Sequence, residues 1–127
     1  MALEQSILKC VKKNLGLDDA YTAFDHDVIT HINTAFFTLN QLGLGPAEGF
    51  MVEDSTPEWD AFTDGRINLN AVKSYVYLRV RLLFDPPGTP HHIKALEDQK
   101  LELEHRLKMD REIDAWGWPP AEESTLP

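Results

Sequence analysis

The chain has 127 residues, of which 43% are hydrophobic, and this composition can supply the core of one domain. Its formal net charge is -9. An acidic surplus disfavours a protein that grips nucleic acid, because such proteins use cations to displace the counterions of the phosphates. No apolar run reaches the length of about 18 residues that a membrane span needs, and the amphipathic N-terminus does not resemble a signal peptide. We therefore expect one soluble domain, made in the cytoplasm and without a membrane partner.

The negative charge is concentrated in one segment of the chain. No Lys or Arg occurs from Asn14 to Gly65, although ten acidic residues lie there. Such a segment would repel phosphates. Two interpretations are open: a solvated acidic face that keeps the protein soluble, or a surface lining a channel through which DNA passes without being gripped.

Two helices are predicted in the first third of the chain. The first ends at Gly16, which suits a left-handed closing position, and its single cysteine, Cys10, is predicted to be an inert buried thiol. The second begins at Asp25 as N-cap, with Asp27 as an acidic residue in the first turn, and runs to about Leu42. The apolar positions of the first helix are Leu3, Ile7, Leu8, Val11 and Leu15.

Residues 49–65 are predicted to contain a brief extended piece followed by a short helix. Phe50 to Val52 suits a brief extended piece. Thr56-Pro57-Glu58 predicts a helix start, with Thr56 as N-cap and proline at the first helical position. We expect a helix of one or two turns that holds Trp59 and Phe62.

The next helix is predicted to begin after Asn68 as N-cap and to end at Phe84. It is apolar nearly all round, so it should lie at the centre of the bundle, with the second and last helices packed on it. Arg79 and Arg81 interrupt this surface. They fit either the boundary of the bundle or a subunit contact, or else an intramolecular pair with a carboxylate. Its main apolar stripe is Leu69, Val72, Val76, Val80 and Leu83.

A proline corner separates this helix from the last one. Pro86 and Pro87 stop the long helix, and Thr89-Pro90 caps and starts another over residues 90–112. Its narrow apolar seam fits docking onto the bundle better than a coiled coil. Glu102 with Arg106, and Glu104 with Lys108, are predicted as i,i+4 pairs. The seam consists of Ile93, Leu96, Leu103 and Leu107, with Lys100 at its middle.

The sequence therefore predicts an all-α fold of about four to five helices with a long central helix, a loop-rich insertion and an extended C-terminal tail. Residues 1–112 form the helical domain and residues 113–127 the tail or arm. Trp116 and Trp118 in that tail either fold back on their own domain or anchor it to a partner.

Little in the sequence points to catalysis. No Cys and His cluster has zinc spacing, and the Gly-rich stretch at residues 43–49 lacks the lysine and hydroxyl of a phosphate loop. We therefore assign no catalytic residue, no cofactor and no metal ligand, and do not favour an enzyme. A site built from the acidic residues between Asp54 and Asp64 is the enzymatic alternative.

Three stretches carry a resemblance to a known family. They are "HINTAFFTLNQLGLGPAEGF" at residues 31–50, "WDAF" at 59–62 and "NAVKSYVYLRVRLLFDPP" at 70–87. Over about residues 5 to 110 the chain resembles the head-tail connector, or adaptor, proteins of long-tailed bacteriophages and prophages. The resemblance implies a small helical protein without catalytic residues. It also implies a ring of twelve copies beneath the portal, joined to a stopper or tail completion protein. DNA passes through the lumen of this ring without sequence-specific binding.

These expectations place the protein at the neck of a virion, after synthesis in the bacterial host cytoplasm. The alternative is a small helical interaction or regulatory adaptor that forms no ring. A possible DNA-channel surface consists of Glu53, Asp54, Asp60 and Asp64. The candidate partner-binding residues are Phe50, Trp59, Arg79, Arg81, Ile113, Trp116 and Trp118.

Overall fold

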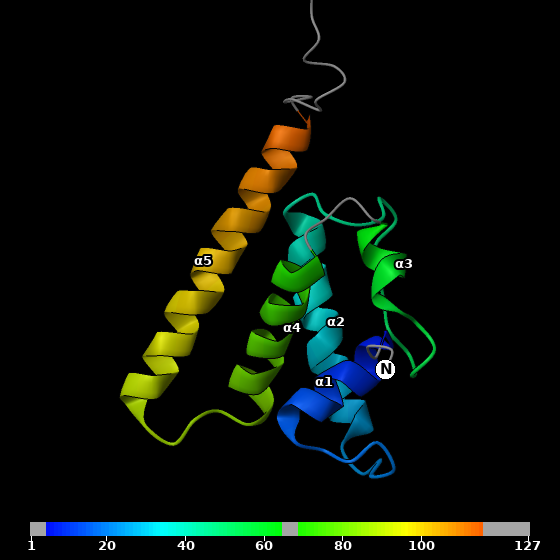
Figure 1. Cartoon of the computed structure of the whole chain (residues 1–127), viewed down its shortest axis with the longest axis vertical. Helices are drawn as coiled ribbons and strands as arrows, with labels where there is room; N and C mark the ends of the chain where they lie inside the picture. The colour runs from blue at the N-terminus through cyan, green and yellow to red at the C-terminus, as the bar shows by residue number, and fades with distance from the viewer. Residues whose placement is uncertain (1–4, 65–68, 116–127) are drawn as a thin grey trace, which may run out of the picture.

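The computed structural model describes residues 5–64 and 69–115 of the chain. Within these ranges the protein is all-α, as predicted, and the only extended pairing is a single antiparallel bridge between Ser6 and Glu58. Figure 1 shows the helices gathered around α4, with α5 along one flank and α3 along the other. The helices are α1 (Ile7–Leu15), α2 (Asp25–Gln41), α3 (Trp59–Thr63), α4 (Leu69–Phe84) and α5 (Pro90–Ala115).

Helix α4 occupies the centre of the bundle, as its all-round apolar surface predicted. Helices α1, α2 and α5 all pack on it. Because water is excluded from several of its sides, each buried side chain contributes roughly 1.5–3 kcal/mol to stability. Leu83, predicted to join the main stripe, instead lies 53% exposed near the end of the helix. The buried residues of α4 are Val72, Tyr75, Val76, Leu78 and Val80.

Helix α1 has the predicted end and a well-defined start. The Ser6 hydroxyl accepts a hydrogen bond from the backbone N–H of Lys9, and Gly16 closes the helix with φ of 85°. Glycine adopts this left-handed conformation without the steric penalty of a Cβ atom. Cys10 is half-buried and packs against the core, so the thiol is less enclosed than the sequence suggested.

The start of α2 differs from the prediction. Phe24 occupies the N-cap position, and no side chain caps the helix there. Asp25 instead lies in the first turn, where its carboxylate accepts a 2.8 Å contact from the Lys12 ammonium. Lys12 is only 2% exposed and also donates to the carbonyl oxygens of Asp19 and Tyr21. The buried cation therefore recruits Asp25, which sequence-local capping rules could not anticipate.

Helix α3 begins two residues later than predicted. Thr56 and Pro57 do not start it, because the chain remains extended through Glu58, whose φ and ψ are -110° and 162°. This extended stretch lies beside the residues before α1: Ile7 N–H donates to the Pro57 carbonyl, and Trp59 N–H donates to the Gln5 carbonyl. Pairing with the N-terminal segment satisfies backbone groups that a helix would otherwise have used.

The corner before α5 forms as expected. His92 N–H donates to the Thr89 hydroxyl at 3.3 Å, which confirms Thr89 as the cap ahead of Pro90. The helix continues to Ala115, three residues past the predicted end. Helix α5 docks along α4, and Leu103 and Leu107 join the core. Docking, and not a coiled coil, is thus the arrangement within the chain.

Candidate interaction surfaces

Trp59, predicted to contact a partner, is completely buried in its own subunit. Its ring lies 6.2 Å from that of Phe36, and the Lys73 ammonium stands 5.9 Å from its centroid. The partner contact predicted for Trp59 stays a prediction, and the folded subunit gives it no support because the side chain has no exposed surface. The apolar bulk that suggested an anchor serves the core.

Phe50 belongs to an aromatic cluster that fixes the insertion between α2 and α3. Its ring lies 4.8 Å from Phe36 and 5.4 Å from Phe62. Gly45 passes so close that an added Cβ atom would clash with the Phe62 ring, and its φ of 81° also favours glycine. Phe50 is half-buried, so only part of its ring remains for a partner.

Arg79 takes the intramolecular alternative. Its guanidinium donates to the Tyr75 hydroxyl at 3.1 Å and lies 3.7 Å from the Glu104 carboxylate. The Tyr75 hydroxyl in turn donates to that carboxylate at 2.6 Å. Burial, followed by the hydrogen bond to Glu104, raises the pKa of Tyr75 well above its ordinary value. These three groups form a polar clamp between α4 and α5, which we call the Tyr75 clamp.

The Tyr75 clamp also explains why one predicted ion pair does not form. Glu104 was expected to pair with Lys108 one turn later, but its carboxylate turns inward to the clamp. The companion pair, Glu102 with Arg106, forms at 3.2 Å on the exposed side of α5. Arg81, for its part, donates to the Tyr77 hydroxyl at 3.1 Å and to the Asp85 carbonyl oxygen at 2.7 Å. Both arginines of α4 are thus engaged within the subunit.

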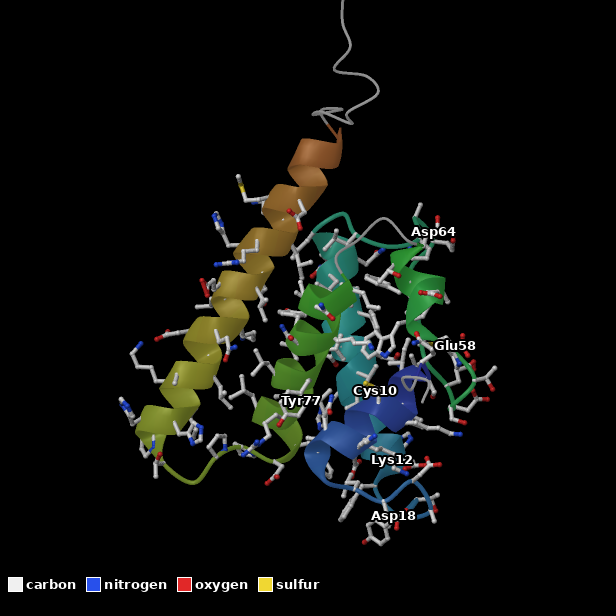
Figure 2. The ribbon with its side chains drawn as sticks, viewed as in Figure 1. Cys10, Lys12, Asp18, Glu58, Asp64 and Tyr77 are labelled. Atoms are coloured by element: carbon white, nitrogen blue, oxygen red, sulfur yellow. The ribbon has the colours of Figure 1, made fainter. Side chains whose placement is uncertain are left out.

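The four predicted channel residues are all exposed. Glu53 and Asp54 precede α3, Asp60 lies in its first turn, and Asp64 ends it in a left-handed conformation with φ of 51°. Figure 2 shows Glu58 and Asp64 at the two ends of α3, on the flank away from α5. Because no Lys or Arg lies between Asn14 and Gly65, these carboxylates have no cation from their own segment beside them. The segment itself therefore contributes negative charge without a compensating Lys or Arg.

Sequence reasoning missed two strongly exposed apolar residues. Phe37 is 63% exposed and Met51 is 67% exposed. Phe36 and Phe37 are adjacent in α2, and since neighbouring helical residues point about 100° apart, only one could enter the core. That geometric signal was available in the sequence. It does not say, however, which phenylalanine is buried.

The three tail residues predicted as partner anchors, Ile113, Trp116 and Trp118, have no described side chain. Ile113 lies in the last turn of α5, which shows that the predicted boundary between residues 112 and 113 falls inside a helix. The side chain of Ile113, and Trp116 and Trp118 altogether, lie outside the described residues.

Neither a metal site nor a membrane-spanning helix is found in the described ranges. There, no group of three or more His, Cys, Asp and Glu side chains is arranged to hold a metal ion. No helix among residues 5–64 and 69–115 combines the length and apolar character needed to cross a membrane.

The family of phage connector proteins matches residues 7–114, a range that takes in nearly all of the five helices. The chain therefore belongs to this family, whose members are structural components of the phage virion that assemble with other virion proteins. No match was found among curated proteins or among solved structures.

Proposed function

We propose that this protein is a head-tail connector, or adaptor, that assembles as a ring of twelve copies beneath the portal. The ring joins the capsid to a stopper or tail completion protein at the phage neck, and DNA passes through its lumen without sequence-specific binding. The protein is made in the host cytoplasm before assembly. The observation that carries this proposal is the family match over residues 7–114.

The exposed acidic residues around α3 support a channel-facing role. Glu53, Asp54, Asp60 and Asp64 are exposed beside or on α3, within a segment that carries no Lys or Arg. At physiological salt the Debye length is about 8 Å, so only carboxylates close to the DNA path would repel its phosphates. We assign residues 50–65 to the lumen or to the surface facing the stopper.

The tail is assigned to attachment. Figure 1 shows the last turns of α5 projecting past the other helices. Tryptophan supplies a large apolar contact area, and Trp116 and Trp118 suit docking onto a neighbouring subunit or the portal. We infer that the core forms without residues 113–127, a prediction that truncation tests.

Electron microscopy of the purified protein mixed with its cognate portal tests the proposal. We expect rings on one end of the portal. Monomers or dimers that leave the portal bare would favour the second candidate, a small helical adaptor that forms no ring. Because a portal supplies a template and raises the effective concentration, the isolated protein need not form rings.

Two sets of variants separate the two assigned roles. Deleting residues 113–127 should leave a folded domain and weaken attachment to DNA-filled heads. Replacing Glu53, Asp54, Asp60 and Asp64 by their amides should leave attachment intact and alter DNA retention. The assay is in-vitro tail joining together with release of packaged DNA. Normal joining by the truncated protein would remove the tail from the proposed attachment surface, and unchanged DNA retention would remove the carboxylates from the lumen.

A further inference from the structure

Two side chains of the bundle hold residues 51–55, just before α3, by their backbone. The Asn33 amide on α2 accepts a hydrogen bond from the Val52 N–H at 2.7 Å and donates to the Val52 carbonyl oxygen at 2.9 Å. Three residues later, the Ser6 hydroxyl donates to the Ser55 carbonyl oxygen at 2.7 Å. These contacts join positions 19 and 49 residues apart in the chain. They therefore attach the segment to the bundle and do not merely stabilise a local turn.

Glu53 and Asp54 are the two residues between these attachment points. Both are exposed, whereas Val52 is completely buried and belongs to the core. The Asp54 carboxylate also accepts a hydrogen bond from the Thr56 N–H at 2.8 Å, which limits the rotation of its side chain. The backbone of the segment is thus held against the core while its two carboxylates stay at the surface.

Asn33 is the attachment point that can be tested separately. Val52 has no exposed surface, so its N–H and carbonyl oxygen cannot turn to water if the amide is removed. An amide side chain suits both groups because it carries a donor and an acceptor side by side. Ser6 has a second task, since its hydroxyl also accepts the Lys9 N–H at the start of α1. Replacing Asn33 therefore loosens the segment without removing the cap of α1.

We propose that Asn33 is a positioning residue for the channel carboxylates Glu53 and Asp54. Repulsion between exposed charges falls off over a Debye length of about 8 Å at physiological salt, so these carboxylates act on DNA only while they are held close to its path. A loosened segment would spread the two charges over a larger volume and weaken the repulsion. Asp60 and Asp64 need no such attachment, because they belong to α3 and its C-cap. This inference rests on the proposed channel role and names the residue that places two of its charges.

Amide hydrogen exchange of residues 51–55 tests the attachment itself. Asn33→Ala removes both bonds to Val52, and we expect the Val52 N–H to exchange roughly ten- to hundredfold faster, because two hydrogen bonds are lost. Asn33→Asp keeps an acceptor for this N–H and loses only the donor, so its exchange should lie between those of the wild type and Asn33→Ala. Circular dichroism checks that helicity is kept. If Asn33→Ala does not fold, Asn33→Asp decides the exchange test.

Asn40→Ala is the matched control on the same helix. Asn40 lies seven residues, or about two turns, after Asn33. Its amide also holds the insertion by backbone groups, donating to the carbonyl oxygens of Leu44 and Pro46 at 3.4 and 2.9 Å. Because these groups lie before the acidic residues, Asn40→Ala should leave exchange of residues 51–55 and DNA retention as in the wild type.

Release of packaged DNA from joined heads tests the positioning role. The double variant Glu53→Gln with Asp54→Asn measures the effect of removing both charges. Asn33→Ala should change DNA retention in the same direction and by no more than this double variant. Added to the double variant it should change nothing further, because no charge is left at these two positions. A merely structural effect of Asn33→Ala would appear equally in both backgrounds.

The outcomes separate this inference from the proposed function. Wild-type exchange of residues 51–55 in both Asn33 variants would overturn the attachment. Faster exchange with wild-type DNA retention, an equal change in the double-variant background, or the same change in Asn40→Ala would overturn the positioning role and leave the channel role standing. Wild-type DNA retention by the double variant would overturn the channel role of Glu53 and Asp54, and this inference with it.

Discussion

The bundle of α1, α2 and α4 and the long helix α5 are held in place by different forces. Helices α2 and α4 meet across fully buried residues such as Ile32, Leu39 and Val76. Helix α5 runs for 26 residues, yet among its described side chains only Leu107 is fully buried, and the Tyr75 clamp supplies its polar tie to α4. The bundle is stabilised by apolar burial over a wide area, whereas α5 depends on a few contacts and should open locally at lower free energy.

The largest expected effect comes from a charge inside the bundle. Val76→Asp places an unpaired carboxylate at a fully buried position, and we expect a loss of about 3–5 kcal/mol or more, enough to prevent folding of a typical domain. Circular dichroism and thermal unfolding measure this effect. Leu83→Asp on the same helix should remain folded. A cooperative, wild-type-like transition of the Val76 variant would contradict the central position of α4.

Removing the main apolar contact of α5 should make this helix open locally more often than the bundle of α1, α2 and α4. Leu107→Ala deletes a fully buried side chain, with an expected cost of about 2–5 kcal/mol. Amide hydrogen exchange should accelerate most in α5 and least in α2. Leu101→Ala, at an exposed position of the same helix, is the control. Equal acceleration in both helices would show that α5 and the bundle unfold as one unit.

The Tyr75 clamp should contribute less than Leu107. Tyr75→Phe removes the hydroxyl that links Arg79 and Glu104, and we expect a loss of about 1–2 kcal/mol at neutral pH. Denaturant unfolding with α5 exchange measures it. Arg79 and Glu104 remain 3.7 Å apart and retain part of their attraction, which limits the loss.

The same variant has a predicted pH signature. Burial and the bond to Glu104 raise the pKa of Tyr75 in the folded state above its unfolded value of about 10. The folded state therefore holds this proton more tightly, and the resulting stability is complete below pH about 10 and is lost as pH rises above it. The stability difference between wild type and Tyr75→Phe should shrink in that alkaline range. A constant difference would show that Tyr75 does not titrate with unfolding.

The smallest effect is expected on the solvent side of α5. Arg106→Ala breaks the exposed pair with Glu102, which at 3.2 Å is worth only about 0.3–0.5 kcal/mol because water and salt screen it. Urea unfolding at low and high salt measures this difference. A loss above that of Tyr75→Phe would mean that an exposed charge pair within α5 stabilises the protein more than the Tyr75 clamp does.

Much of the fold was predictable because it depends on local chemistry. Gly16 ends α1 since only glycine adopts its φ freely, Thr89 and Pro90 start α5, and the all-round apolar surface of α4 requires neighbours on several sides. The start of α3 was wrong because backbone groups of Pro57 and Trp59 pair with the N-terminal segment. That pairing joins residues about fifty positions apart, and local rules contain no term for it.

The candidate surfaces were less predictable, because residue type does not state which group a side chain meets. The acidic segment and the apolar character of Phe36, Phe37 and Trp59 follow from residue type alone. The packing of the helices buries Trp59 and leaves Phe37 exposed, and it brings Glu104 of α5 to Arg79 of α4. Periodicity fixes the direction of a side chain relative to its own helix, but the group that it meets depends on how the helices pack.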